Sequence, residues 1–452
     1  MSETFNQALA TPPGLLDIAA RYPEAYPFLL DSVARGPLGR YSILMRSTGE
    51  FLTLDGAGDI QGPGRGRQFL PRLEAWYQAE SSEPAAPSCL PFNGGWFIYL
   101  GYELAGEIEP VLDLPRAQDG LPVALAVRCD GAFIIDHREP ETAWLVAETV
   151  ATRDRMQAEL AALHPAGEKP GGVPPAARIQ AEPDAAFIDA VLRVKDYISA
   201  GDVFQVNLSR GWRITLQGDA EPLALYRRLR QSNPAPFAGM MQWNGRCLMS
   251  SSPERLIEVR GRLVQTRPIA GTYPRGADEE SDQSLSRALL AHPKERAEHI
   301  MLIDLERNDL GRVCETRSVE VSEMMVVESY AHVHHIVSNV RGKLKQDATP
   351  CQVISAVFPG GTITGCPKVR CMQIIAELEG QGRGFYTGAM GYLGRDGQMD
   401  LNILIRTLLL SGQQVRLRTG AGIVADSVPA KELAETVAKA RGMLQALEPG
   451  HA

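Results

Sequence analysis

The stretch GAMGYLGRDGQMDLNILIRTLLL, residues 388–410, indicates how this chain folds. Strand-like runs lie on either side of a short turn, and short turns of this kind join neighbouring antiparallel strands. We expect a strand at 401–410 and another at 415–418, with long helices alternating with such strands. The sequence therefore predicts an α+β fold, in which helices lie outside antiparallel sheets, rather than a doubly wound sheet.

A change in composition separates the N-terminal part from the rest of the chain. Residues 164–175, HPAGEKPGGVPP, are so rich in Pro and Gly that neither a helix nor a strand can continue through them. Helices are expected on both sides, over 153–163 and 183–200. Short β-like runs precede the break, at 41–45, 95–100, 123–127 and 131–135. The predicted division is an N-terminal region of residues 1–165, a linker of 166–182 and a second domain of 183–447.

Composition excludes several classes of protein. The 452 residues are 44% hydrophobic and 22% charged, and the formal net charge of −8 argues against nucleic-acid binding. An anionic substrate therefore needs local cations or a metal ion. The N-terminus carries no signal segment, no apolar run approaches membrane-spanning length, and the seven cysteines show no CxxC spacing. These features predict a cytoplasmic protein with reduced cysteines and no membrane partner.

Two glutamates on expected helices are candidates for metal binding. Glu298 shares a helical face with Leu302 and Leu305, and an ionised carboxylate on an apolar stripe requires an ion-pair partner or a metal ion. The residues alone favour neither interpretation. Glu435 lies one turn before Lys439 and off the apolar stripe expected for its helix, which favours a solvated ion pair there.

Glycine-rich segments at 358–368 and 420–427 follow strand-like runs. Backbone N–H groups in such segments can hold a carboxylate or a phosphate, although isolated glycines usually mark turns. The first segment lacks the Gly-Lys-Ser/Thr ending of a phosphate loop, which excludes ATP binding of that type. The pair His334-His335 lies in an apolar strand-like run, where neighbouring side chains point to opposite faces. At most one of these histidines faces a given site.

Nine segments stand out by their order and wording: FQVNLS (204–209), SPERL (252–256), TRPIAGT (266–272), ERAEHIMLIDLERND (295–309), VHHIVS (333–338), FPGGTITGCPK (358–368), YTGAMGYL (386–393), ILIRT (403–407) and GAGIVADS (420–427). Together they resemble the chorismate-utilising enzymes. That family includes component I of aminodeoxychorismate synthase, component I of anthranilate synthase, and the isochorismate and salicylate synthases. The resemblance extends from about residue 185 to 445, and a weaker match runs through LLDS (29–32) and Gly94-Gly95.

This resemblance implies an α+β fold with two large antiparallel sheets packed face to face, helices outside and the active site between the sheets. It also implies that Glu298 and Glu435 bind Mg²⁺, an ion that prefers a few carboxylates, waters and a ligand oxygen. Glu254 corresponds to the general acid that protonates the departing C4 hydroxyl of chorismate, which requires a raised pKa. The other implied site residues are His335 beside the leaving group, Ala270 and Thr272 in TRPIAGT, and Thr364, Tyr386, Arg406, Gly420, Gly422 and Lys439 around the substrate.

One position bears on the choice of nucleophile. Relatives that add water use a lysine as base where this chain has Gln205, so the resemblance favours ammonia, which is already a nucleophile. The chain has no G-x-C-x-G-like segment for glutamine hydrolysis. We therefore expect a separate glutaminase subunit that passes ammonia across an interface.

The residues disagree on which carbon receives the nitrogen. Asn207, Gly360-Gly361, Phe237 and the compact N-terminal region resemble component I of aminodeoxychorismate synthase, which aminates C4. Ala270 stands where well-known members of that subfamily have a lysine, and in this it resembles anthranilate synthase, which aminates C2. We expect C4 amination, toward 4-aminobenzoate and folate, with anthranilate synthase component I as the alternative. A non-catalytic regulatory subunit is a third interpretation, which the complete set of acidic and basic site residues opposes.

The family also has a tryptophan pocket, and LLDS and NPAPF resemble the segments that form it. The residues expected around a bound tryptophan are therefore Leu30, Ser32, Asn233, Pro234 and Phe237. The sequence alone leaves open whether such a pocket regulates the protein or is only structural.

Overall fold

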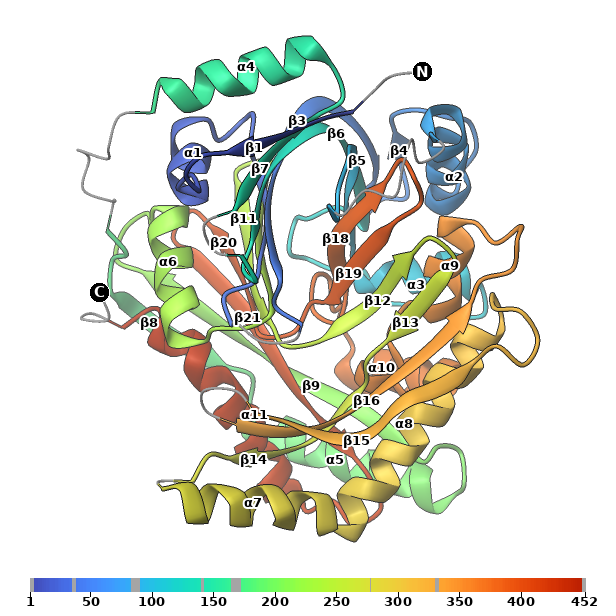
Figure 1. The fold of residues 1–452 in the computed structure, drawn as a ribbon. Coiled ribbons are helices and arrows are strands. Elements are labelled where there is room, and N and C mark those ends of the chain that lie inside the picture. Colours follow the sequence, from blue (N-terminus) through green and yellow to red (C-terminus); the bar gives the residue numbers. More distant parts are fainter. Residues whose placement is uncertain are drawn as a thin grey trace.

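The computed structural model describes residues 4–34, 38–82, 90–139, 142–163, 172–276, 278–329 and 333–448. Every strand pairing in these ranges is antiparallel, and the pairings join the strands into one network with helices outside it (Figure 1). The network divides into two halves, which we call the first and the second wing. The prediction of an α+β fold on large antiparallel sheets is confirmed.

The first wing is built around the long strand β9 (Gln205–Leu216), which is buried along most of its length. Its apolar residues pack against two helices, α5 and α10, that cover it on the outside. Neighbouring strands follow in the order β8 (Ala176–Ala181), β9, β21 (Gln414–Ile423), β20 (Thr407–Ser411), β11 (Arg246–Ser252), β10 (Phe237–Trp243) and β2 (Phe28–Asp31). The short strand β17 (Gly365–Cys366) pairs with the start of β9.

The second wing contains the long strand β16 (Val333–Lys343), which pairs with three others. The order of this wing is β5 (Gly95–Leu100), β18 (Ala389–Gly394), β19 (Met399–Ile403), β12 (Arg255–Arg260), β13 (Leu263–Thr266) and β16. Strands β14 (Ile269–Pro274) and β15 (Glu320–Ser329) also pair with β16. The inward side of β14 and β16 thus faces β9 and β21 of the first wing (Figure 1).

Two long N-terminal strands join the wings at one end. β3 (Tyr41–Leu54) pairs with β2 of the first wing and with β6 (Ala124–Asp136), and β6 pairs with β5 of the second wing. The remaining strands, β7 (Ala143–Ala147), β1 (Phe5–Leu9) and β4 (Ile60–Gln61), extend this end of the network. The runs expected at 123–127 and 131–135 are parts of the single strand β6.

The wings are joined a second time where the backbone crosses from one to the other. Residues 253–254 lead from β11 in the first wing to β12 in the second, and residues 404–406 lead from β19 in the second wing to β20 in the first. The two crossings are hydrogen-bonded to each other, because the N–H of Ile403 donates to the carbonyl oxygen of Glu254 (3.0 Å) and the N–H of Ser251 donates to that of Arg406 (3.0 Å). The single strand expected at 401–410 is therefore wrong: it is two strands in different wings, separated by this crossing.

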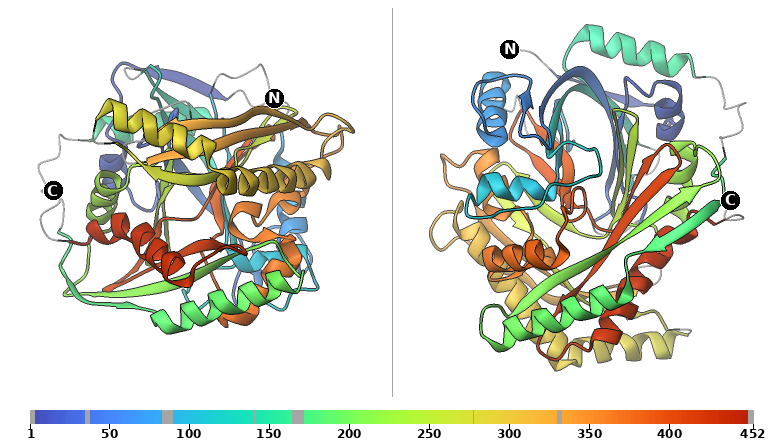
Figure 2. Two further views of the ribbon diagram at one scale, coloured as in Figure 1. Left: turned by 90° about the horizontal axis from the view of Figure 1, so that it is seen from below. Right: turned by 180° about the vertical axis from the view of Figure 1, so that it is seen from behind.

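Helices cover the outer faces of both wings. α11 packs against β21, whereas α7 and α8 pack against β14 and β16, so α8 and α11 lie on opposite sides of the space between the wings (Figure 2, left). The helices are α1 (Leu15–Arg21), α2 (Phe69–Glu80), α3 (Ala105–Ile108), α4 (Val150–Ala161), α5 (Asp184–Ser199), α6 (Pro222–Ser232), α7 (Glu279–Ala291), α8 (Pro293–Gly311), α9 (Pro350–Val357), α10 (Lys368–Glu379) and α11 (Pro429–Gln445), with 3₁₀ turns η1 (Tyr102–Leu104) and η2 (Gly361–Ile363). Among the helices of the described ranges, none joins the length and the apolar character that spanning a bilayer requires.

The predicted division of the chain does not correspond to a division of the sheets. Strands before residue 165 pair with strands far beyond it, as β5 does with β18 and β2 with β10. The range 166–182, predicted as a linker, contains β8, whose largely exposed residues are held by pairing with β9. Residues 164–171, which include most of the Pro- and Gly-rich stretch, lie outside the described residues.

One aromatic contact packs the two wings against each other, and we expect a large loss of stability when it is removed. Phe28 of β2 and Phe97 of β5 are fully buried and stack with ring centroids 4.1 Å apart. Phe97→Ala should lower the free energy of unfolding by about 3–5 kcal/mol, because it removes a buried ring and leaves a cavity. Urea titration followed by circular dichroism measures this change. Val111→Ala, at a side chain that is 66% exposed, should change it by no more than about 0.5 kcal/mol; equal effects of the two substitutions would contradict the packing described.

Candidate functional site

A cavity of about 600 Å³ lies between the wings, and its wall is drawn from both. The first wing contributes residues of β9, β21 and α11, and the second contributes residues of β14, β16 and α8. The predicted site residues that line it are Gln205, Glu254, Ala270, Glu298, His335, Tyr386, Arg406, Gly420, Gly422, Glu435 and Lys439. Segments far apart in the chain are thus brought together around one cavity.

The crossings between the wings place a carboxyl group and a guanidinium close together at the cavity. Glu254 follows Pro253 on one crossing, and Arg406 ends the other in a left-handed conformation (φ 50°). A positive φ is strained for a non-glycine residue, and such strain is found most often at binding and active sites. The hydrogen bonds between the two crossings fix both side chains relative to each other.

Arg406 is a cation without a protein anion. Within the described residues it forms no ion pair, although its guanidinium is enclosed by protein and lines the cavity. Burial lowers the pKa of Arg406, and the nearby charge of Glu254 partly opposes that effect. An enclosed guanidinium that lacks a carboxylate of its own is suited to bind one from a ligand.

Glu254 is suited to donate a proton near neutral pH. Burial raises the pKa of this carboxyl to about 7, against the lowering effects of Thr362, the Ile269 N–H and the more distant positive charges. Its Oε1 atom is buried without a hydrogen-bond partner in the described structure. A carboxyl group that keeps a substantial protonated fraction at neutral pH and faces a cavity has the properties of a general acid.

The structure separates the two adjacent histidines as expected. His335 lines the cavity, whereas His334 contacts Asp282 (3.0 Å) and Ser329 (2.7 Å) on the other face of β16. Burial, together with the nearby positive charges, lowers the pKa of His335 to about 4, so its ring is neutral at physiological pH. Its Nδ1 lies 3.3 Å from the carbonyl oxygen of Gly271, which assigns the ring proton to Nδ1. His335 is therefore a hydrogen-bonding group rather than an acid.

Carboxylates from two facing helices border the same cavity. They are Glu295 and Glu298 of α8, and Glu432 and Glu435 of α11. The ion pair expected between Glu435 and Lys439 is present (2.7 Å), and Lys439 also donates to the carbonyl oxygen of Gly420 (2.9 Å). Val437 belongs to the apolar stripe expected for α11, but it is exposed. The buried residues are Glu432, Thr436, Ala440 and Met443, so the buried face is displaced from the expected one. This rotation turns Glu435 toward the cavity.

This arrangement fits Mg²⁺ better than a metal held wholly by protein. Within the described ranges, no three His, Cys, Asp or Glu side chains converge on one point. Mg²⁺ commonly takes only one or two carboxylates and fills its other positions with water and ligand oxygens. The four carboxylates border the same cavity as the cation Arg406, and Glu435 among them pairs with Lys439. Glu298 and Glu435, the expected metal ligands, both line this cavity.

The floor of the cavity on the first wing is made by alternate residues of β9 and by two glycines of β21. Gln205 and Asn207 lie two residues apart on the same face of β9, and each has a buried amide oxygen without a partner in the described structure. A Cβ atom at Gly420 would lie only 2.6 Å from the Tyr386 hydroxyl and 2.7 Å from Asn207 Oδ1. Gly420 therefore keeps open the space between these two side chains and the ligand.

Several predicted residues lie elsewhere or are joined by neighbours. Thr364 does not line the cavity: its buried side chain donates to the carbonyl oxygen of Gly360 (2.9 Å), and Thr362 and Ile363 form the wall instead. Thr272 lies opposite His335 in the β14–β16 pairing, but its side chain lies outside the described part of the structure. The sequence reasoning also missed Glu295 and Glu432. Each lies three residues before an expected metal ligand and therefore on the same helical face, and this spacing could have identified it.

The residues expected around tryptophan belong to two cavities. Leu30, Ser32 and Phe237 line a separate cavity of about 470 Å³, whereas Asn233 and Pro234 line the cavity between the wings. Pro236 borders both, so the NPAPF segment forms the partition between them. The single tryptophan pocket expected from the sequence is therefore corrected. Three of its five expected residues, Leu30, Ser32 and Phe237, line one cavity together.

The chain is similar to known proteins along most of its length. A family model described as chorismate binding enzyme matches residues 45–445. The chain is 40% identical to an anthranilate synthase component 1 of Thermus thermophilus, over 100% of this chain and 98% of the relative. It is also 40% identical to an aminodeoxychorismate synthase component 1 of Bacillus subtilis, over 93% of this chain and 91% of the relative. Further relatives with 37–39% identity are named anthranilate synthase component 1.

Among solved structures, the anthranilate synthase component I of Streptococcus pneumoniae is similar to this chain, with a TM-score of 0.80 and 32% sequence identity. The similarity covers 90% of this chain and 93% of that one. The two-wing architecture is therefore shared along nearly the full length of both proteins.

The raised pKa of Glu254 predicts a pH-dependent difference in stability. Because this carboxyl ionises at about 7 in the folded state and near 4.5 when unfolded, its stabilising contribution is complete below the lower value and is lost as pH rises through the higher one. Glu254→Gln carries no such loss. Relative to the wild-type protein, this variant should therefore gain about 3 kcal/mol between pH 4.5 and pH 8.

Thermal unfolding at several pH values measures this difference. Glu24→Gln, at an exposed carboxylate, is the control and should show no pH-dependent difference from wild type. A constant gap between Glu254→Gln and wild type across this range would show that Glu254 ionises normally.

Proposed function

The chain belongs to the chorismate-binding enzymes, and on that premise we propose that it aminates chorismate in the cavity between its wings. The observation that carries the proposal is the pairing of Arg406, an enclosed cation without a protein anion, with the protonated acid Glu254 on the adjoining crossing. Chorismate is an anion that loses a hydroxyl group, so it requires both a cation and an acid.

The residues of the cavity divide this chemistry among them. Arg406 binds one substrate carboxylate as a two-donor fork, together with the backbone around Gly420 and Gly422. Glu254 transfers its proton to the C4 hydroxyl, which leaves as water, and the resulting carboxylate regains a proton from solvent. His335 is neutral and orients the departing group by hydrogen bonding. Tyr386 and Lys439 complete the wall around the substrate.

Glu298 and Glu435 are the groups that would hold Mg²⁺ in this site. When bound, the ion would draw electron density from the ring carboxylate and favour departure of the C4 hydroxyl. Glu295 and Glu432 add negative charge that attracts a divalent cation.

The expected nucleophile is ammonia. Gln205 stands where water-adding relatives have a lysine base, and its amide cannot deprotonate water. The unpartnered oxygens of Gln205 and Asn207 supply two acceptors on one face of β9, which suits a molecule with several N–H donors. Since no segment for glutamine hydrolysis was found in the sequence, a separate glutaminase subunit is the proposed source of ammonia, as the name component 1 of the relatives suggests.

Amination at C2, followed by elimination of the enolpyruvyl group as pyruvate, gives anthranilate, and this is the route that the cavity supports best. Ala270 lines the cavity where a covalent C4 route would need a lysine, and Lys439, the one lysine in the described cavity wall, is engaged by Glu435 and Gly420. Direct attack on C2 needs no such residue. Most of the relatives named above are anthranilate synthase components, which supports the same product.

C4 amination, the route expected from the sequence, becomes the second candidate, and specific features still favour it. The Bacillus subtilis relative with that name is as similar to this chain as the Thermus thermophilus one, and Asn207, Phe237 and Gly360-Gly361 resemble that subfamily. With Ala270 in place of lysine, ammonia would have to attack C4 directly.

Tryptophan is proposed as a ligand of the cavity lined by Leu30, Ser32 and Phe237.

Removal of one expected metal ligand should abolish turnover while the fold survives. Glu298→Gln keeps the size of a half-buried side chain but removes its charge, so we expect kcat/KM for chorismate to fall about 100-fold or more at any tested Mg²⁺ concentration. Steady-state assays with chorismate, an ammonium salt and Mg²⁺ measure this loss, and circular dichroism verifies folding. The matched control is Asp304→Asn, which removes a carboxylate from the exposed side of the same helix and should retain full activity. Near-normal activity of Glu298→Gln would refute the metal assignment.

The product decides between the two amination routes. Purified protein incubated with chorismate, Mg²⁺ and an ammonium salt should release anthranilate together with pyruvate, which chromatography and mass spectrometry identify. Aminodeoxychorismate, convertible to 4-aminobenzoate by an added lyase, would instead establish C4 amination and show that Ala270 does not prevent it. Chorismate left unchanged by an otherwise folded protein would support the regulatory interpretation and overturn the proposal.

A further inference from the structure

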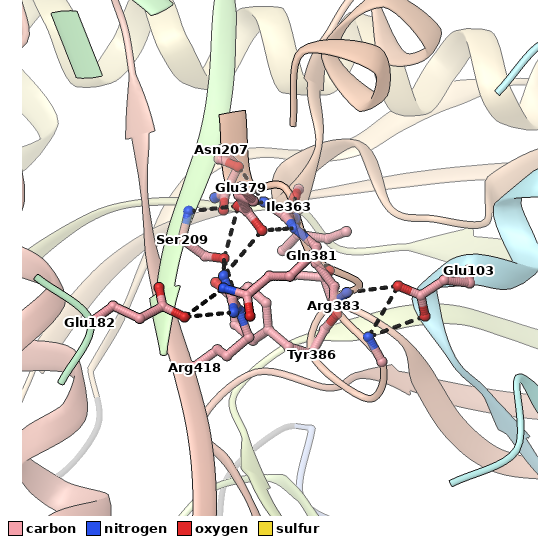
Figure 3. A network of polar contacts seen from close by, with 12 residues as sticks. Glu103, Glu182, Asn207, Ser209, Ile363, Glu379, Gln381, Arg383, Tyr386 and Arg418 are labelled. Atoms are coloured by element: carbon pink, nitrogen blue, oxygen red, sulfur yellow. Dashed lines mark hydrogen bonds and ion pairs between the residues drawn. The ribbon is translucent and has the colours of Figure 1, made fainter. Parts of the chain in front are cut away.

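A buried ion pair lies directly behind the first-wing wall of the cavity. Glu379, the last residue of α10, and Arg383, in the loop that follows, are linked by two hydrogen bonds of 2.6 and 3.1 Å (Figure 3). Their side chains are 2% and 1% exposed. Arg383 does not line the cavity between the wings, so any influence on a ligand there acts through other residues.

The guanidinium of Arg383 joins three segments that do line the cavity. It donates to the backbone carbonyl oxygens of Asn207 (2.7 Å) and Ile363 (3.2 Å), and its charge lies 5.5 Å from the ring centre of Tyr386. Each of these residues contributes to the cavity wall. Because a guanidinium is planar and its donors have fixed directions, these bonds set the distances among the three segments.

The carboxylate of Glu379 extends this arrangement to β21. It accepts hydrogen bonds from the backbone N–H and the hydroxyl of Ser209 (both 2.9 Å) and from Arg418 of β21 (3.2 Å). Ser209 pairs with Gly420, and Asn207 with Gly422, in the β9–β21 ladder. Glu379 thus bonds to both strands, through Ser209 and Arg418 (Figure 3), close to the two glycines that line the cavity.

The backbone of the Arg383 loop is fixed from the N-terminal region as well. Glu103 of η1 accepts hydrogen bonds from the N–H groups of Arg383 (2.7 Å) and Gly384 (3.1 Å). The loop is therefore held at both its backbone and its side chain. Few alternative positions remain for the Tyr386 ring that follows it.

We propose that the Glu379–Arg383 pair is a positioning unit, which holds Asn207, Ile363 and Tyr386 at the spacing that chorismate binding requires. This inference rests on the proposed use of the cavity for chorismate. The pair contacts neither the substrate nor the reacting atoms. Its effect on the ligand is exerted through the three wall segments and the β9–β21 register.

Arg383→Lys tests the proposal, because lysine keeps the charge but replaces the planar guanidinium, whose donors have fixed directions, with a single ammonium group. The matched control is Arg128→Lys. Arg128 also forms a buried pair, with Glu148 (2.6 Å; 7% and 8% exposed), and donates to the carbonyl oxygens of Gly95 and Cys129, yet it lies away from the cavity. A general loss of packing or stability should affect both variants alike, whereas mispositioned wall residues should affect only Arg383→Lys.

The measurement is the dissociation constant of chorismate, by calorimetry with Mg²⁺ and without ammonia, at a temperature where both variants are folded. We expect at least about tenfold weaker binding for Arg383→Lys and less than about twofold change for Arg128→Lys. Should Arg383→Lys fail to fold, Ser209→Ala replaces it. That variant removes the hydroxyl shared by Glu379 and Arg418 and should weaken binding about threefold.

Each outcome separates this inference from the proposed function. If Arg383→Lys, or Ser209→Ala in its place, binds chorismate as tightly as the wild-type protein does, the positioning role is overturned. Equal weakening of binding in the Arg128→Lys control would overturn it as well. Suppose that the wild-type protein binds chorismate without aminating it, and that Arg383→Lys alone weakens this binding. That result would support the positioning role and refute the proposed reaction. A wild-type protein that does not bind chorismate would overturn both.

Discussion

The mutual hydrogen bonding of the two backbone crossings is the constraint on which the rest of the site depends. Where a sheet divides, strands lose neighbours, and buried backbone groups must find other partners. Here the N–H of Ile403 bonds to Glu254 and the N–H of Ser251 bonds to Arg406, while the Ser252 hydroxyl donates to the carbonyl oxygen of Ile403 (2.6 Å). The division of the sheet therefore costs few hydrogen bonds. It also fixes an acid and a cation at the point where the wings part.

Electrostatics explain why the cavity suits a small anion in a protein of net negative charge. The overall charge of −8 repels anions at long range, but Arg406 is enclosed and close to the ligand, where its attraction is screened less than that of a surface charge. The carboxylates of α8 and α11 reverse this preference at the other side of the cavity unless a divalent cation joins them. Substrate and metal ion are thus expected to bind more tightly together than separately.

Patterns with a local cause were predictable from the sequence. The antiparallel arrangement followed from short turns between strand-like runs, and the two histidines could be separated by strand alternation alone. The helical face of Glu298 with Leu302 and Leu305 was also correct, because both leucines are buried. The roles of the site residues came from the resemblance to a family rather than from such patterns.

Features set by tertiary contacts were not predictable in the same way. Residues 401–410 are largely apolar, so nothing local marks the crossing at 404–406. Strand β8 is mainly exposed, and its position depends on pairing with β9. On α11 the buried positions include Glu432 and Thr436, which a hydrophobic pattern assigns to solvent, and Thr364 turned away from the cavity because it bonds to its own loop.

A crystal structure of the protein soaked with chorismate and Mg²⁺, without ammonia, tests the central claim most directly. The account predicts the ligand in the cavity between the wings, with one carboxylate on Arg406, the C4 hydroxyl beside Glu254, and the ion between Glu298 and Glu435. Chorismate bound elsewhere, for instance beside Leu30 and Phe237, or in this cavity with Arg406 unoccupied, would contradict it.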